Sequence, residues 1–169
     1  MNIPFVDPKS QYVSIKPQMD TAIQSILERT AFVMGQDVEA FERAFAEFLG
    51  VKHVIGVGAG TEALRLALEA LDIGSGDEVL TVADTFIATC EAISHVGVDV
   101  RLVDANPHTY NMHPDRLEAA ITPRTKAVIP VHLYRQPTDM DPILEIAHKH
   151  HLRASKIALN LTTRGIKTR

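Results

Sequence analysis

Apolar residues in the first part of the chain recur at helical spacing. Within residues 14–29 they fall every three or four positions, at Ile15, Met19, Ile23 and Ile26, which predicts an amphipathic helix. After a loop at residues 30–36, a second helical pattern begins. Its apolar residues are Phe41, Phe45 and Phe48. Phenylalanines at this spacing are typical of a core face rather than of a cofactor site.

The second helix carries recognisable end signals. Asp37 has a side chain suited to an N-cap, and Gly50 is typical of the residue that ends a helix. We therefore predict a helix that begins at Asp37 and ends before Gly50.

Beyond this point, short β-rich runs alternate with helical runs. The predicted strands are 54–57, 78–82, 100–103 and 126–131. The predicted helices are 61–71, 86–96, 114–121 and 140–150. Alternation of this kind predicts an α/β fold, a three-layer αβα sandwich with a mostly parallel sheet that is covered on both faces.

The last residues break the alternation. Residues 153–169 stand where the next buried strand is due, yet they are polar, basic and without regular spacing. We therefore separate residues 1–152, which follow the α/β pattern, from an aberrant tail at residues 153–169.

The stretch from Val54 to Leu64 predicts an anion-binding corner. It combines a β-branched run, three glycines and the start of an amphipathic helix. The N–H groups of a helix start lack intrahelical partners and carry the positive end of the helix dipole, so a phosphate group suits this position. Both a dinucleotide and pyridoxal phosphate could supply that phosphate.

The glycine spacing disfavours the dinucleotide. Its fingerprint needs a glycine where Thr61 stands. The end of the next strand also offers no clear ribose-binding acid, since the nearest acid, Asp84, is close to a helix start. For pyridoxal phosphate, Gly60 permits close approach and Thr61 adds a hydroxyl donor. The plain alternative makes Thr61 a helix cap.

An aromatic residue follows the neighbouring predicted strand. Phe86 lies after its carboxyl end, where open α/β sheets bind ligands, and its ring could stack on a pyridine ring. Taken alone, Phe86 is more typical of a core residue of the following helix.

Composition narrows the function classes. The net charge of −4 comes without a basic stripe, so we expect no nucleic-acid partner. No apolar run approaches the roughly 18 residues of a membrane span, and residues 1–7 lack the features of a signal peptide, so we expect a cytoplasmic protein.

The cysteine and histidine content predicts neither a disulfide nor a metal site. Because Cys90 is the single cysteine, the chain cannot form an internal disulfide. The histidines lack the spacing of metal ligands, so we expect no metal site.

Several motifs together resemble those of one enzyme family. They are Ile3–Asp7, Phe41–Glu42, Gly50–His53, Gly60–Leu64, Gly76–Val79, Thr85–Thr89 and Pro130–Tyr134. From about residue 3 to 152, the chain resembles the DegT/DnrJ/StrS family of sugar aminotransferases, which are pyridoxal-phosphate enzymes of aminotransferase fold type I. The resemblance makes residues 1–152 the N-terminal part of a truncated large domain.

This resemblance implies a reaction and a cofactor. Family members are homodimers that transfer an amino group from an amino acid, usually glutamate, to a keto group of a nucleotide-linked sugar, for surface polysaccharides or antibiotics. The implied cofactor is pyridoxal 5'-phosphate. The equivalents of Gly60 and Thr61 bind its phosphate, and the equivalent of Phe86 stacks on its ring.

The family's Schiff-base lysine and pyridine-nitrogen aspartate lie beyond the position that matches residue 152. Lys156 and Lys167 match no family motif, so we assign no catalytic residue. Arg135 stands where the family has a glycine, and we expect it to crowd the site. We thus expect an aminotransferase by ancestry that is inactive as this fragment. The alternative is a non-catalytic fragment that only binds phosphate weakly or associates with a subunit.

The tail itself predicts a frameshift near codon 153. Back-translated in a shifted frame, residues 153–169 can encode Glu-Asp-Cys-Ala-Gln, which resembles the family's Glu-Asp-x-Ala-Gln motif around the missing aspartate. We expect sequencing of the gene across this codon to show that motif in the shifted frame. Nucleotides that encode anything else there would refute the hypothesis.

Overall fold

The computed structural model describes residues 5–133 and 136–154. The chain divides after Gly56 into two compact units, which are described separately. Arg135 and the tail from residue 155 onward lie outside the described residues, so the predictions on them stay predictions.

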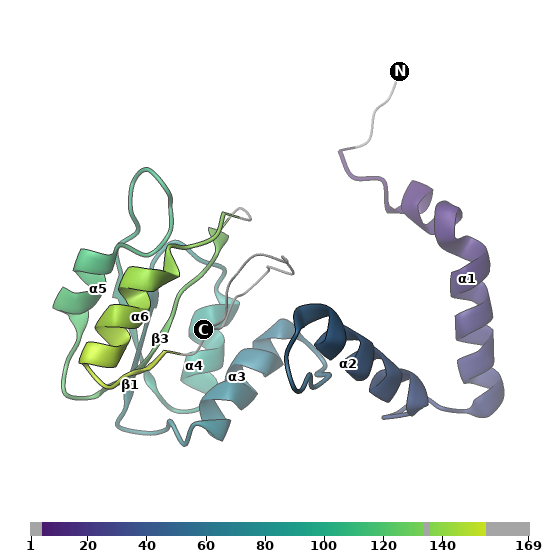
Figure 1. The fold of residues 1–169 in the computed structure, drawn as a ribbon, viewed down its shortest axis with the longest axis horizontal. Coiled ribbons are helices and arrows are strands. Elements are labelled where there is room, and N and C mark those ends of the chain that lie inside the picture. The colour runs from purple at the N-terminus through teal and green to yellow at the C-terminus, as the bar shows by residue number, and fades with distance from the viewer. Residues whose placement is uncertain (1–4, 134–135, 155–169) are drawn as a thin grey trace. The chain divides into compact units, whose positions relative to one another are not determined.

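The N-terminal unit begins with helix α1 (Pro8–Arg29) (Figure 1). Its start is earlier than the predicted Ser14 because Asp7 is an N-cap whose carboxylate accepts the Ser10 N–H at 3.1 Å, and Pro8 occupies the first turn. None of the residues of α1 is buried. Its apolar stripe therefore stays exposed within the described chain.

Helix α2 (Gln36–Leu49) differs from its prediction at the start and agrees at the end. Gly35, and not Asp37, is the N-cap, and the Asp37 carboxylate instead accepts from Arg29 Nη2 at 2.8 Å. Gly50 ends the helix with φ of 69°, a left-handed conformation that glycine adopts without steric cost.

The phenylalanines of α2 stack on one another and do not form a buried core. Their ring centroids lie 5.4 Å apart for Phe41 and Phe45, and 6.0 Å apart for Phe45 and Phe48. Phe41 remains 57% exposed. The prediction of a core face is therefore wrong for this unit as described.

The C-terminal unit contains a parallel sheet in the order β2-β1-β3-β4. Its strands are β1 (Glu78–Val82), β2 (Asp99–Val103), β3 (Thr125–Ile129) and β4 (Arg153–Ala154). The first three match predicted strands. β3 ends two residues before the predicted Val131, at Ile129, because Pro130 follows and cannot donate to a strand ladder.

Residues 54–57 do not form the predicted strand. A strand needs a neighbouring strand for its backbone groups, and none of the four strands of the described sheet pairs with these residues. In place of a ladder bond, the Gly56 N–H donates to Glu42 Oε1 at 2.6 Å. The segment enters α3 (Gly60–Ala70) as an extended, largely exposed chain.

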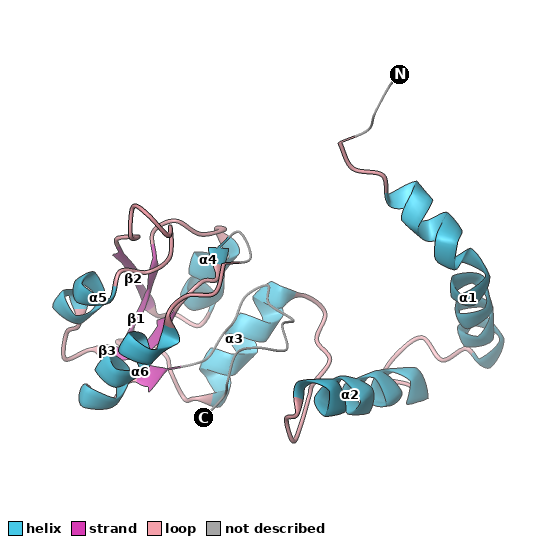
Figure 2. Cartoon of the chain, turned by 45° about the horizontal axis from the view of Figure 1, so that its top comes forward, coloured by secondary structure: helices cyan, strands magenta, loops and turns pink. Residues whose placement is uncertain are grey.

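Helices cover both faces of the sheet (Figures 1 and 2). They are α3, α4 (Ala88–His95), α5 (Pro114–Ala120) and α6 (Met140–Lys149). Side chains of α3 and α4 pack with Val79 and Ile129, whereas those of α5 and α6 pack with Leu80 and Val128. Neighbouring strand residues point to opposite faces, so these two clusters are the two inner surfaces of a three-layer αβα sandwich, as predicted.

Glu78 anchors the amino edge of the sheet. It is 3% exposed, and its Oε1 accepts from the hydroxyls of Thr125 at 2.8 Å and Thr122 at 3.1 Å. Arg101 and Arg124 lie 3.6 Å from its Oε2. The buried charge is thereby hydrogen-bonded and paired, as a carboxylate in a protein interior must be.

The turn between β3 and α6 is fixed by buried polar side chains. His132 Nδ1 accepts the Thr138 N–H at 2.9 Å, and the Thr138 hydroxyl donates to the Val131 carbonyl at 2.9 Å. Asn111, from the loop before α5, accepts the Leu133 N–H at 3.2 Å through its Oδ1. These bonds tie both ends of the turn together.

Burial lowers the pKa of His132 below that of an exposed histidine, so protonation opposes folding. The unfolded chain binds a proton as pH falls through about 6.5, so stability should be constant above that pH and decline below it. We expect wild-type protein to lose stability to urea between about pH 7 and 5.5. His132→Asn keeps an acceptor for Thr138 and should lose much less, whereas substitution of exposed His148 by Asn should leave the decline intact. Equal pH slopes for wild type and His132→Asn would contradict this.

Candidate cofactor site

The strand order reverses between β1 and β3. From β1 the chain crosses through α4 on one face to β2, and from β3 it crosses through α6 on the other face to β4. The loops that leave β1 and β3 therefore diverge to opposite faces. In open α/β sheets, ligands bind in the crevice that such a reversal opens at the carboxyl ends of the strands.

Helix α3 has an uncapped N-terminus, which lies at the carboxyl edge of the sheet. Only residues 71–77 join α3 to the amino end of β1, and Leu64 and Leu68 pack in the cluster that contains Val79. An 11-residue helix and a five-residue strand are both about 16 Å long. The start of α3 therefore lies level with the carboxyl end of β1.

The start of α3 keeps free donors and open space. Its N-cap, Ala59, provides no side-chain cap, and the first intrahelical bond runs from Ala63 N–H to Ala59 O at 3.0 Å. The N–H groups of Gly60 and Thr61 precede that bond and so have no intrahelical acceptor. A Cβ placed on Gly60 would meet nothing within 4 Å.

An acidic residue in the same turn is held by a cation. Glu62 Oε2 accepts from Arg65 Nη2 at 2.8 Å, and this hydrogen bond lowers the pKa of Glu62. Arg65 also binds Glu69 at 2.5 Å. Glu62 is therefore engaged along the helix, and the donors of Gly60 and Thr61 remain available to an external anion.

Phe86 stands in the loop after β1. It is 70% exposed, so the alternative that makes it a core residue is wrong for the described chain. Helix α4 begins at Ala88, after Phe86 rather than at it. The loop is held by a contact of 3.2 Å between the hydroxyls of Thr85 and Thr89. An exposed aromatic ring is thus presented at the carboxyl edge of the sheet.

The turn after β3 forms the other side of the crevice. It carries His132, which is 4% exposed, and it is held by Asn111, which is also 4% exposed. No sequence motif marks Asn111 as a site residue. The side-chain hydrogen bonds of Asn111 join residues 22 to 26 positions apart, so no local sequence pattern indicates them.

The described lysines of the C-terminal unit lie at the amino edge of the sheet, opposite the crevice. Lys126 is the second residue of β3, and Lys149 is the last residue of α6, where its Nζ lies 2.6 Å from Glu118 Oε1. Both positions belong to the amino edge, a strand length of about 16 Å from the crevice. Neither lysine is placed to react with a ligand there.

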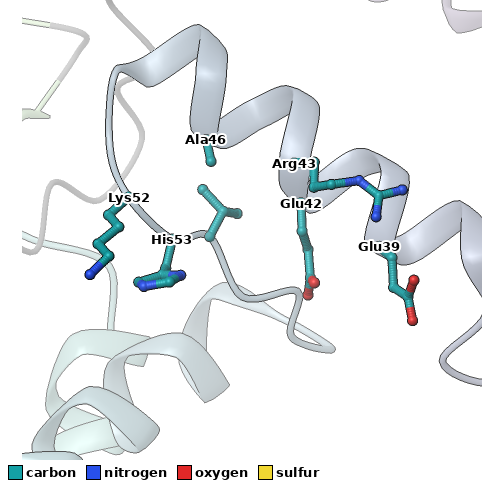
Figure 3. Close-up of a pocket in the computed structure, with 7 residues that line it drawn as sticks. Glu39, Glu42, Arg43, Ala46, Lys52 and His53 are labelled. Atoms are coloured by element: carbon teal, nitrogen blue, oxygen red, sulfur yellow. The ribbon is translucent and has the colours of Figure 1, made fainter.

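The N-terminal unit has a separate hollow of about 280 Å³ (Figure 3). Figure 3 shows Glu39 and Glu42 on α2 and Lys52 and His53 on the segment that follows it. Two acidic side chains, Glu39 and Glu42, and two basic ones, Arg43 and Lys52, line this hollow together with His53, so it has no clear bias toward an anion. The described residues contain no group of three or more potential metal ligands and no helix that could cross a membrane.

Comparison with known proteins matches most of the chain. Residues 13–155 match the model of the DegT/DnrJ/EryC1/StrS aminotransferase family. A UDP-N-acetyl-3-dehydro-alpha-D-glucosamine 3-aminotransferase from Acidithiobacillus ferrooxidans is 46% identical over 151 residues, which is 89% of this chain and 41% of that relative. The chain thus spans about two fifths of the length of this curated relative.

Solved structures agree with the fold. DesV from S. venezuelae has a TM-score of 0.86 and 40% identity over 89% of this chain and 40% of its own. NtdA from Bacillus subtilis, solved with bound cofactor PMP, has a TM-score of 0.84 and 34% identity over 90% of this chain and 35% of its own. The three-layer sandwich is therefore part of a pyridoxal-dependent transferase fold, and this chain belongs to the DegT/DnrJ/EryC1/StrS aminotransferase family.

Proposed function

We propose that residues 1–152 are the N-terminal part of the large domain of a pyridoxal-phosphate-dependent aminotransferase that acts on nucleotide-linked keto sugars. The observation that carries this proposal is the uncapped start of α3 beside the strand-order reversal, within a chain 46% identical to a nucleotide-sugar aminotransferase. The family resemblance adds glutamate as amino donor, a homodimeric enzyme and a cytoplasmic location.

The residues present fit the cofactor. The N–H groups of Gly60 and Thr61 and the Thr61 hydroxyl suit its phosphate, and the space around Gly60 admits it. The exposed ring of Phe86 suits the face of a pyridine ring. When bound, pyridoxal phosphate supplies an electron sink for amino transfer, and these residues orient it and fix its depth in the crevice.

We further propose that the described residues of the C-terminal unit bind the cofactor without catalysing amino transfer. The support is the placement of Lys126 and Lys149 at the amino edge, away from the crevice. Neither can hold the cofactor covalently or move a proton next to it. The described residues would therefore provide binding and orientation, which are one part of the activity of the relatives.

The test measures binding of pyridoxal phosphate to the chain by equilibrium dialysis. We expect saturable binding that inorganic phosphate displaces, with no borohydride-stable adduct on Lys126 or Lys149. Thr61→Val should weaken binding about tenfold, because it removes one charge-assisted hydrogen bond. Phe86→Leu should weaken it roughly threefold to tenfold through lost stacking.

Ser94→Ala is the matched control, since it removes an exposed hydroxyl near the end of α4. Its affinity should equal that of the wild type. The proposal fails if wild-type protein shows no saturable binding, or if Thr61→Val and Ser94→Ala behave alike.

A further inference from the structure

His132 occupies a position that the proposed cofactor contacts do not use. Thr81 of β1 pairs with Ile129 of β3, so the loop with Phe86 and the turn with His132 leave neighbouring strands at the same edge. The phosphate site at α3 and the ring of Phe86 are on the β1 side of the strand-order reversal. His132 is on the β3 side.

The hydrogen bond to Thr138 fixes which nitrogen of His132 carries the proton. Nδ1 accepts the Thr138 N–H at 2.9 Å, so in the neutral ring the proton must be on Nε2. Burial keeps the ring neutral, since it lowers the pKa of His132. The side chain is therefore an acceptor on one side and a donor on the other.

The donor side of the ring has no protein partner in the described chain. His113 Nδ1 is the buried side-chain polar atom that lacks a hydrogen bond among the described residues. His132 Nε2 is not such an atom, and no described residue accepts its hydrogen. If His132 served only to accept the hydrogen bond from the Thr138 N–H, its Nε2–H would have no role, so this donor is available to a ligand.

The orientation of the ring is fixed from several directions. The Thr138 hydroxyl donates to Val131 O at 2.9 Å, which holds the backbone immediately before His132. Asn111 holds the next residue, Leu133, and its Nδ2 donates to Gln136 O at 3.3 Å. A donor fixed in this way loses little conformational entropy when it binds a ligand.

We propose that the Nε2–H of His132 donates a hydrogen bond to an oxygen on the edge of the bound pyridoxal ring, with Asn111 and Thr138 as positioning residues. This inference rests on the proposed function. With the phosphate at α3 and the ring face on Phe86, the oxygens left for the β3 side are the ring hydroxyl and the aldehyde. Both accept hydrogen bonds from a neutral N–H.

Two substitutions separate the donor role from the structural role. His132→Asn places a carbonyl oxygen where Nδ1 accepts from Thr138, but it removes the distal donor. His132→Gln can extend an N–H toward the position of Nε2, but it gives up the acceptor for Thr138. Asn should therefore be the more stable variant in urea, and Gln the better binder of pyridoxal phosphate.

We expect His132→Asn to bind pyridoxal phosphate about fivefold more weakly than wild type, the effect of one hydrogen bond. His132→Gln should stay within about twofold. With inorganic phosphate as the probe, the two variants should match the wild type, because its site is at α3. The proposal is overturned if affinity follows stability instead, with Asn equal to wild type and Gln weaker, or if both variants lose phosphate affinity equally.

Ligand variants test the same contact on wild-type protein. Pyridoxamine phosphate lacks the aldehyde oxygen, and a second analogue lacks the ring hydroxyl. A severalfold loss with one of them identifies the accepting oxygen, whereas no loss with either overturns the proposal. If wild type fails to bind pyridoxal phosphate at all, the proposed function and this inference both fall. Wild-type binding with an unaffected His132→Asn removes the inference alone.

Discussion

The reversal of strand order between β1 and β3 is the constraint on which the site depends. Parallel neighbours require crossover connections, and such connections are right-handed, so a chain that changes direction must also change face. Here α4 crosses on one face and α6 on the other. The loops after β1 and β3 separate for that reason, and no special side chain is needed to open the crevice.

The two edges of the sheet use their polar groups differently. At the amino edge, Glu78 binds two hydroxyls and lies near two arginines, so its groups are committed to the fold. At the carboxyl edge, the N–H groups that open α3 are uncapped and the ring of Phe86 is exposed. Free donors and an exposed ring at one edge, with committed charges at the other, are the arrangement expected of a ligand-binding sheet.

Much of this arrangement could be predicted from the sequence, and its failures have physical causes. The strands β1, β2 and β3 are short β-rich runs, a local signal that the sequence displays. Residues 54–57 carry the same local signal yet form no strand, because a strand also requires a neighbouring backbone. Asn111 escaped prediction since its partners are more than 20 positions away in the chain.

The three proposed cofactor residues belong to sequence motifs of the family, and the fold explains why they occur at these positions in the chain. Gly60 and Thr61 begin a helix that returns along the sheet, and Phe86 follows the strand after it. Reasoning from the residues alone left Thr61 as a possible cap and Phe86 as a possible core residue. The exposure of Phe86 removes the second of these alternatives. The first is also wrong, because Ala59 and not Thr61 is the N-cap of α3.

The most direct test of the account is a titration of isotope-labelled protein with pyridoxal phosphate, followed by the NMR signals of the backbone amides. We predict that the largest shifts occur at Gly60, Thr61 and Phe86 and in the turn after His132, all at the carboxyl edge of the sheet. Shifts concentrated instead around Lys126 and Lys149, at the amino edge, would contradict the placement of the site in the crevice between β1 and β3.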